Sequence, residues 1–210
     1  MAPPRKHQTD VILDATRALV LAEGPRAASV GAIAKASGAP AGTLYHRFGN
    51  RNGILTAAWL RALERFQVRA LAAATADTVL ESAVATAVAA IDFMREVPDD
   101  ARLLVAVRPS DLLDGEPDDD FDQTLDAQNA PLIKRVRTFA RELYGSSDAR
   151  CVDAVARAVV DLPYAVVRRH ANGDPIPAWL EDDVAAASCA LLTSFSPARG
   201  SKPRSSSKHR

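Results

Sequence analysis

The chain has 210 residues, enough for one or two small domains with an apolar core. Hydrophobic residues make up 48% and charged residues 25%, a balance typical of globular proteins in water. No apolar run reaches the length of a membrane span, and the polar N-terminus leads into no signal-type stretch, so we expect neither feature. Two cysteines, Cys151 and Cys189, are too few for a disulfide scaffold and predict a reduced, cytoplasmic protein.

The formal net charge of zero hides an uneven distribution of charge along the chain. Residues 1–60 carry a net charge of +4, residues 61–195 a net charge of −9, and residues 196–210 a net charge of +5. Basic ends around an acidic middle favour a polyanion-binding end attached to a separate body. Charge alone is equally compatible with chance clustering.

The first predicted helix contains the apolar positions Val11, Ile12, Ala15, Leu19 and Ala22, which recur with a helical period. Thr9 or Asp10 is placed to cap its N-terminus. Gly24 followed by Pro25 is typical of a helix end and predicts its C-terminus.

Two short helices follow, separated by a tight turn. Ser29 is placed to cap the first, over residues 30–36, and Pro40 suits the first turn of the second, which extends to about Arg47. Gly38 lies between them and tolerates the positive φ that such a turn requires. Asn50 is placed to cap the next helix.

For the rest of the chain, the sequence predicts longer helices separated by short breaks. We predict helices over residues 52–74, 77–95, 99–108, 121–144, 147–170 and 178–195. No useful stretch alternates apolar and polar residues, so the predicted fold class is all-α, with about nine helices and no strands. Residues 111–120 read as an acidic loop, and residues 196–210 as a basic disordered tail, either solvated without a role or adding phosphate contacts.

Residues 29–55, SVGAIAKASGAPAGTLYHRFGNRNGIL, have the layout of a helix–turn–helix. Leu44 and Phe48 lie four residues apart and can anchor the second helix on Ile33 and Ala34 of the first. The other faces of the second helix then offer hydroxyl, ring-nitrogen and guanidinium donors, and Gly42 leaves room for a close backbone approach to DNA.

Residues 9–60 resemble the tetracycline-repressor (TetR) family of bacterial regulators, and beyond them only the helical layout and total length are similar. The matching residues are Ser29, Ile33, Ala34, Gly38, the run GTLYHRF at 42–48, Asn50, Arg51 and Leu55. The resemblance implies a helix–turn–helix DNA-binding domain over residues 1–50 and a helical dimerisation and ligand-binding domain over residues 51–195.

The resemblance also implies which residues meet double-stranded DNA: Ser29, Ala41, Gly42, Thr43, Tyr45, His46 and Arg51. Thr43 is expected to face the base edges, and Ala41 offers a methyl contact. Tyr45 and His46 are expected to contact the groove or phosphates. Ser29 and Arg51 stand at helix N-termini, where free N–H groups favour phosphate.

Three departures from the family pattern leave a second function open. Pro40 replaces a hydroxyl residue, Asn52 and Gly53 follow Arg51 where an acidic residue is usual, and Gly31 replaces a larger polar residue. The alternative is a helical ligand- or partner-binding protein with degenerate DNA recognition.

For the body, the resemblance implies a homodimer that reads a palindromic operator and encloses a pocket for a small-molecule effector. The apolar stripes of the last two helices can fill the core, form the dimer interface, or do both on different faces. The candidate pocket residues, each of which can instead belong to core or surface, are Trp59, Phe66, Phe93, Phe121 and Gln128.

The predicted function is transcriptional regulation, most often repression in this family, with the effector lowering operator affinity through the helix that follows Asn50. The sequence lacks a Gly-x-Ser-x-Gly elbow, a phosphate-binding glycine loop and a His-Glu-x-x-His motif, so we predict no enzymatic activity. The acidic run at residues 118–120 is expected to be solvated, and we predict neither a metal nor a cofactor.

Overall fold

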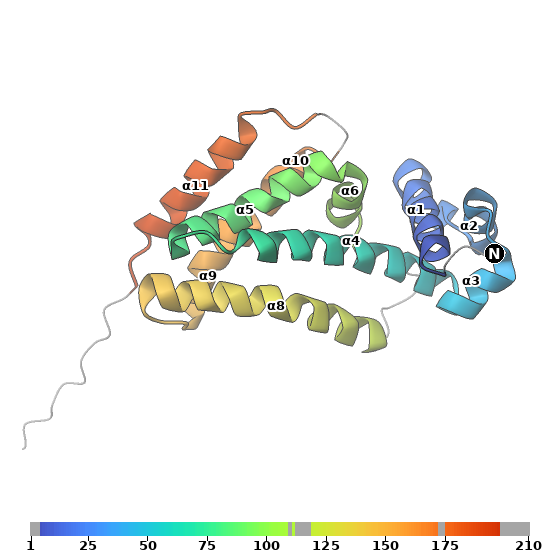
Figure 1. Ribbon diagram of the computed structural model, residues 1–210, viewed down its shortest axis with the longest axis horizontal. Coiled ribbons are helices and arrows are strands. Elements are labelled where there is room, and N and C mark those ends of the chain that lie inside the picture. The colour runs from blue at the N-terminus through green and yellow to red at the C-terminus, as the bar shows by residue number, and fades with distance from the viewer. Residues whose placement is uncertain (1–4, 109–110, 112–118, 172–174, 198–210) are drawn as a thin grey trace, which may run out of the picture.

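A computed structural model describes residues 5–108, 111, 119–171 and 175–197, and its regular elements are all helical (Figure 1). The expected all-α fold class is thereby confirmed. None of the helices in these ranges is long and apolar enough to cross a membrane. The acidic run at 118–120 and the tail from residue 198 lie outside the described side chains.

The N-terminal part consists of α1 (Arg5–Glu23), a 3₁₀ turn η1 (Pro25–Ala27), α2 (Val30–Ser37) and α3 (Ala41–Phe48). The predicted bounds of α2 and α3 are correct to within one residue. The predicted start of α1 is wrong, because Thr9 and Asp10 lie inside the helix and make contacts with other helices. The Thr9 hydroxyl accepts a hydrogen bond from Arg47, and the Asp10 carboxylate accepts one from Arg61.

Local hydrogen bonds explain why α2 begins where it does. The Ser29 hydroxyl accepts a hydrogen bond from the backbone N–H of Ala32 at 3.1 Å, as predicted. Gly38 ends the helix with φ of 69°, a left-handed conformation that glycine adopts without a Cβ clash.

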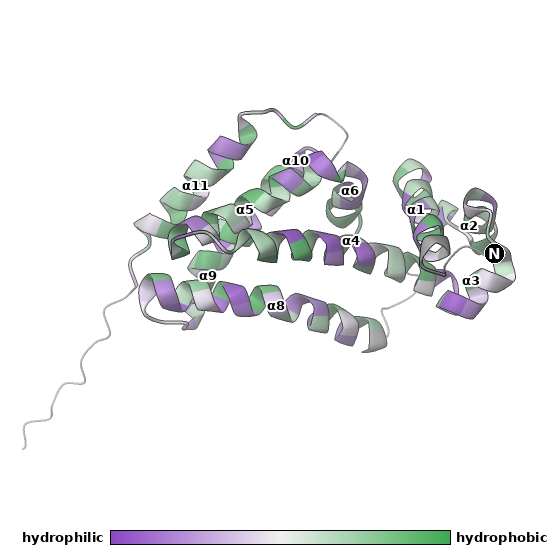
Figure 2. Ribbon diagram, in the orientation of Figure 1, coloured by the Kyte–Doolittle hydropathy of each residue, from purple (hydrophilic) through white to green (hydrophobic). Residues whose placement is uncertain are grey.

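The body contains α4 (Arg51–Ala73), α5 (Val79–Glu96), α6 (Pro98–Ala106), α8 (Asp119–Tyr144), α9 (Ala149–Ala156), a π-helical turn η2 (Arg157–Asp161), α10 (Leu162–Arg169) and α11 (Leu180–Ser194). Figure 1 shows α4 extending from the N-terminal helices through the body, with α8 alongside it. Figure 2 shows a largely hydrophobic α5, which packs against both α4 and α11.

Two helix starts in the body lie two residues later than predicted, at Val79 instead of 77 and at Ala149 instead of 147. Thr78 caps α5, and its reciprocal bonds with Glu81 form a capping box. Asp148 caps α9 by accepting the backbone N–H of Cys151 at 2.9 Å.

One hydrophobic core joins the N-terminal helices to the start of the body. Ile33 and Leu44 are fully buried against each other's helices, as the spacing predicted. The same cluster continues along α4 to Trp59 and includes Leu103 and Val107 at α6. The first half of α4 therefore packs with the helix–turn–helix and is not a free linker.

The junction between α3 and α4 requires a glycine. Asn50 caps α4 by accepting the backbone N–H of Gly53 at 2.9 Å, and this bond holds Gly53 against the end of α3. A Cβ at position 53 would lie 2.0 Å from the carbonyl oxygen of Phe48. This contact gives a structural reason for Gly53, one of the departures from the family pattern.

We predict that Gly53→Ala destabilises the protein by about 2 kcal/mol or more, because the backbone of Phe48 must shift. Gly31→Ala in α2 is the matched control: its Cβ would meet open space, so we expect a gain of about 0.5–1 kcal/mol. Urea unfolding followed by circular dichroism measures both. Equal effects of the two substitutions would contradict this account of the junction.

Candidate DNA-binding face and effector cavity

The exposed face of α3 carries most of the residues predicted to meet DNA. Ala41, Gly42, Tyr45 and His46 are all exposed, and their spacing places them on one side of the helix. Leu44, on the opposite side, is fully buried. Tyr45 has 54% of its surface exposed, which is high for a large aromatic residue and leaves its ring free to contact a partner.

Thr43 and Ser29 lie at the edges of this face. Thr43 is half-buried, and its backbone N–H donates to the carbonyl of Pro40 at 2.9 Å. Ser29 is exposed at the N-terminus of α2, and because its oxygen accepts the cap hydrogen bond, its hydroxyl proton remains able to donate to an anion.

The guanidinium of Arg51 has a setting that the sequence did not indicate. Its Nε donates to the carbonyl of Ala28 at 3.1 Å, and one terminal nitrogen donates to the carbonyl of Pro25. Arg51 therefore joins the start of α4 to the start of η1 and to the residue that follows η1. This geometry supports a positioning role beside the DNA-binding face.

A buried ionic cluster joins α1, α4 and α6. Asp100, with 1% of its surface exposed, accepts hydrogen bonds from Arg17 of α1 and, at 2.8 Å, from Arg65 of α4. The more exposed Asp99 lies 3.7 Å from Arg17. Sequence patterns gave no sign of this cluster because its members are 35 and 83 positions apart.

Opposing effects act on the pKa of Asp100. Burial raises it, but hydrogen bonds and charges from Arg65 and Arg17 outweigh burial and hold the pKa below its ordinary value. The ion pairs therefore stabilise the fold above the ordinary pKa of 3.8, and this contribution disappears as the pH falls through the lower pKa of the folded state.

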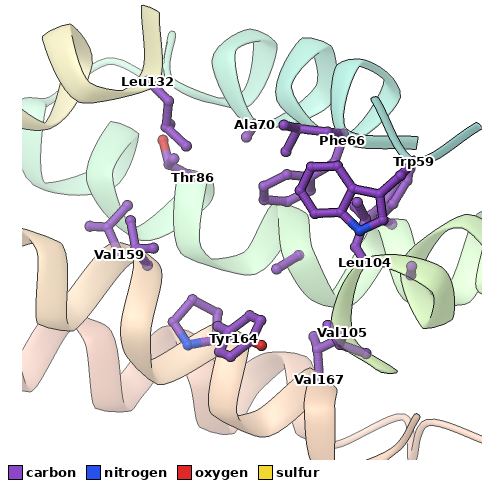
Figure 3. A pocket seen from close by; sticks show the side chains of 16 residues that line it. Trp59, Phe66, Ala70, Thr86, Leu104, Val105, Leu132, Val159, Tyr164 and Val167 are labelled. Carbon is purple, nitrogen blue, oxygen red and sulfur yellow. The ribbon is translucent and has the colours of Figure 1, made fainter. Parts of the chain in front are cut away.

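A cavity of about 210 Å³ lies in the body between α4, α5, α6, α8, η2 and α10 (Figure 3). Figure 3 shows Trp59 and Phe66 on one side and Tyr164 and Val167 on the other. The aromatic rings of Phe66 and Phe93 pack with their centroids 5.6 Å apart. The cavity wall is overwhelmingly apolar, as expected of a site for a small organic molecule.

Three of the five predicted pocket residues, Trp59, Phe66 and Phe93, line this cavity. Phe121 and Gln128 lie outside the lining that the described residues form. Both belong to the first half of α8, whereas Leu132, one turn after Gln128, is the α8 residue that reaches the cavity. The sequence did not indicate that η2 and α10 contribute to the cavity wall. Their valines recur at helical spacing, which is equally typical of residues in a filled core.

The π-helical turn forms part of the cavity wall and has an identifiable cause. Pro163 has no N–H, so it cannot donate to the carbonyl of Ala158, while the N–H of Leu162 donates to Arg157. The hydroxyl of Ser188 on α11 donates to the Ala158 carbonyl at 3.0 Å instead, and Ser188 is fully buried. This bond connects the cavity wall to α11.

Comparison with known proteins identifies the N-terminal part of the chain. Residues 12–58 match the family model described as bacterial regulatory proteins, tetR family. The N-terminal part of the chain is therefore a TetR-type DNA-binding domain, as found in bacterial transcriptional regulators. The matched residues are those that build the helix–turn–helix and the start of α4.

Solved structures share the fold of this chain over nearly its whole length. A TetR-like regulator from Rhodococcus sp. RHA1 has 17% identity and a TM-score of 0.67, covering 91% of this chain and 97% of its own. The fatty acid degradation regulator FadR from Bacillus halodurans has 18% identity and a TM-score of 0.67, covering 89% and 98%. The ketosteroid transcriptional regulator KstR2 of Mycobacterium tuberculosis has 17% identity and a TM-score of 0.61, covering 94% and 97%. No curated protein sequence matches the chain.

We predict that Asp100→Asn lowers the free energy of unfolding by about 3 kcal/mol near neutral pH, because two arginines lose a buried charged partner. Asp99→Asn, at a half-exposed ion pair, should cost less than about 1 kcal/mol. The deficit of Asp100→Asn should shrink as the pH falls below 3.8, when the wild-type carboxylate is also neutralised. Urea unfolding across this pH range measures it, and a deficit independent of pH would contradict the assignment.

The hydrogen bond from Ser188 to the π-turn can be tested by substitution. We predict that Ser188→Ala lowers the free energy of unfolding by about 1–3 kcal/mol, because the buried carbonyl of Ala158 loses its donor. Ser194→Ala removes an exposed and longer bond on the same helix and should cost under about 0.5 kcal/mol. Both values come from urea unfolding at one protein concentration. A Ser188 variant as stable as the Ser194 variant would show that the carbonyl needs no such donor.

Proposed function

We propose that this protein is a homodimeric repressor of the TetR type that is released from a palindromic operator by a small-molecule effector. The observation that carries the proposal is the exposed, polar and aromatic face of α3, held on a buried helix–turn–helix core. A protein that bound only ligands would need no exposed tyrosine and histidine on such a helix.

On this proposal, the residues at the DNA take roles that match their positions. Tyr45 and His46 meet the groove or phosphates, Thr43 the base edges, and Ser29 a phosphate. Ala41 and Gly42 let the start of α3 come close to the bases. Arg51 assists by holding α2 and α4 together, since its donors are engaged by backbone carbonyls.

On this proposal, residues 1–50 form the DNA-binding domain, and residues 51–195 form the domain that dimerises and binds the effector. The protein acts in the cytoplasm. Val184 and Leu192 of α11 are buried within the chain, while Ala186, Ala190 and Leu191 are exposed on the same helix. Small and apolar exposed residues allow close helix packing, which supports a dimer through α11. Two copies of α3 then read half-sites about 34–36 Å apart.

Helix α6 transmits the effect of ligand binding from the cavity to the DNA-binding helices. Its residues Ala101, Leu104 and Val105 line the cavity, while Asp100 of the same helix holds Arg17 of α1. A ligand that prefers a shifted α6 therefore also favours a shifted α1 and a changed spacing of the two α3 helices. By linkage, operator DNA then weakens the binding of that ligand by the same factor.

We predict that Tyr45→Ala weakens binding to operator DNA about 10–100-fold, because each half-site loses an aromatic contact. Fluorescence anisotropy on DNA from upstream of the protein's own gene, beside scrambled DNA, measures the effect. Val68→Ala, which shortens an exposed side chain on the middle of α4, is the control and should bind like the wild type.

The dependence on salt provides the decisive comparison. Six or more phosphate contacts should give a slope of log affinity against log salt of about −5 or steeper. Operator binding that Tyr45→Ala leaves unchanged would contradict the proposed DNA-binding face. Weak binding to both DNAs, with a flat salt dependence, would favour a helical protein that has lost DNA recognition.

A further inference from the structure

The cavity wall contains no charged side chain among the described residues. A carboxylate or ammonium group placed inside would therefore lose its water without gaining a partner of opposite charge. The free energy of removing an ion from water without a partner is far larger than the favourable free energy of burying a hydrocarbon chain. The wall thus discriminates against ions of both signs.

Two of the polar atoms in the wall already have partners within the protein. The indole N–H of Trp59 donates to the carbonyl of Val107 at 3.2 Å. The hydroxyl of Thr86 donates to the carbonyl of Ser82 at 2.7 Å. Neither proton is available to a ligand without breaking a buried hydrogen bond.

Tyr164 differs from these two residues. It lines the cavity from α10, has 46% of its surface exposed, and its hydroxyl makes no hydrogen bond within the described structure. Figure 3 shows its ring on the wall opposite Trp59. Its position at the solvent edge allows one contact between the phenol and a polar end of a molecule inside.

We propose that the cavity binds a neutral, mostly hydrocarbon molecule whose one polar group is hydrogen-bonded by the Tyr164 hydroxyl at the cavity mouth. This inference rests on the proposed effector site and specifies its ligand class. A cavity of 150 Å³ lined by apolar residues holds a benzene ring, so 210 Å³ suits a molecule of about eight to ten non-hydrogen atoms.

The test uses three eight-carbon probes that differ in charge: 1-octanol, octanoate and octylammonium. Trp59 lies in the wall and Trp179 is exposed, so a Trp179→Phe background leaves Trp59 as the single fluorescent reporter. We expect 1-octanol to change the Trp59 emission with saturation, and to bind at least tenfold more tightly than either ion near neutral pH. Octanoate or the ammonium binding as tightly as 1-octanol overturns the inference, as does the absence of binding by all three.

The second variant tests Tyr164 itself. Tyr164→Phe keeps the ring and should weaken 1-octanol binding about three- to tenfold, the equivalent of one hydrogen bond. Ethylbenzene, which has no hydrogen-bonding group, should bind the variant and the parent equally. Equal loss for both molecules would assign Tyr164 a packing role only and overturn its part of the proposal.

Operator binding, measured without ligand on the same protein, separates the two claims. A protein that binds its operator but none of the probes contradicts the ligand class and leaves the DNA-binding function intact. A protein that binds 1-octanol in the cavity but no DNA contradicts the proposed function and leaves the ligand class intact.

Discussion

The buried carboxylate of Asp100 sets how the DNA-binding helices are joined to the ligand-binding body. A charge with 1% exposure needs nearby opposite charge, and the two arginines that supply it come from α1 and α4. Three helices are therefore fixed to one point. Breaking a buried ion pair costs more free energy than any of the surrounding exposed pairs contributes. Any displacement of α6 therefore either moves α1 with it or replaces the ion pairs of Asp100 by others.

The shared hydrophobic core acts alongside this ionic constraint. Trp59 belongs to the core that packs the helix–turn–helix and also forms part of the cavity wall. Its indole N–H holds Val107 just beyond the end of α6. A molecule that displaces Trp59 consequently affects the packing of the N-terminal helices and the end of α6 at once. Coupling between the two sites follows from shared residues and requires no long chain of contacts.

Local signals made the helix–turn–helix predictable from sequence. Ser29, Gly38 and Asn50 act on backbone groups within three residues, so their effects are readable without tertiary structure. The predicted start of α1 is wrong because Thr9 does not cap the helix but lies inside it, where its hydroxyl accepts a hydrogen bond from Arg47, a partner 38 positions away. The same reason applies to Arg51, whose carbonyl partners become neighbours only after folding.

The body was less predictable because its features depend on packing between distant segments. The π-turn at residues 157–161 lies directly before Pro163 and accepts a hydrogen bond from the hydroxyl of Ser188, a residue 30 positions from its partner Ala158, and neither residue alone indicates the turn. The residues that line the cavity and those that fill the core are equally apolar, so the sequence does not distinguish them. Phe93 and Phe121 are equally good candidates by sequence, but only Phe93 lines the cavity.

Hydrogen exchange followed by mass spectrometry, with and without saturating 1-octanol, tests most directly whether cavity and DNA-binding helices form one coupled unit. The account predicts changed exchange in α6 and also in α1 around Arg17, with the α1 change lost in Asp100→Asn while the change in the cavity helices persists. Changes confined to the cavity helices of the wild-type protein would contradict it.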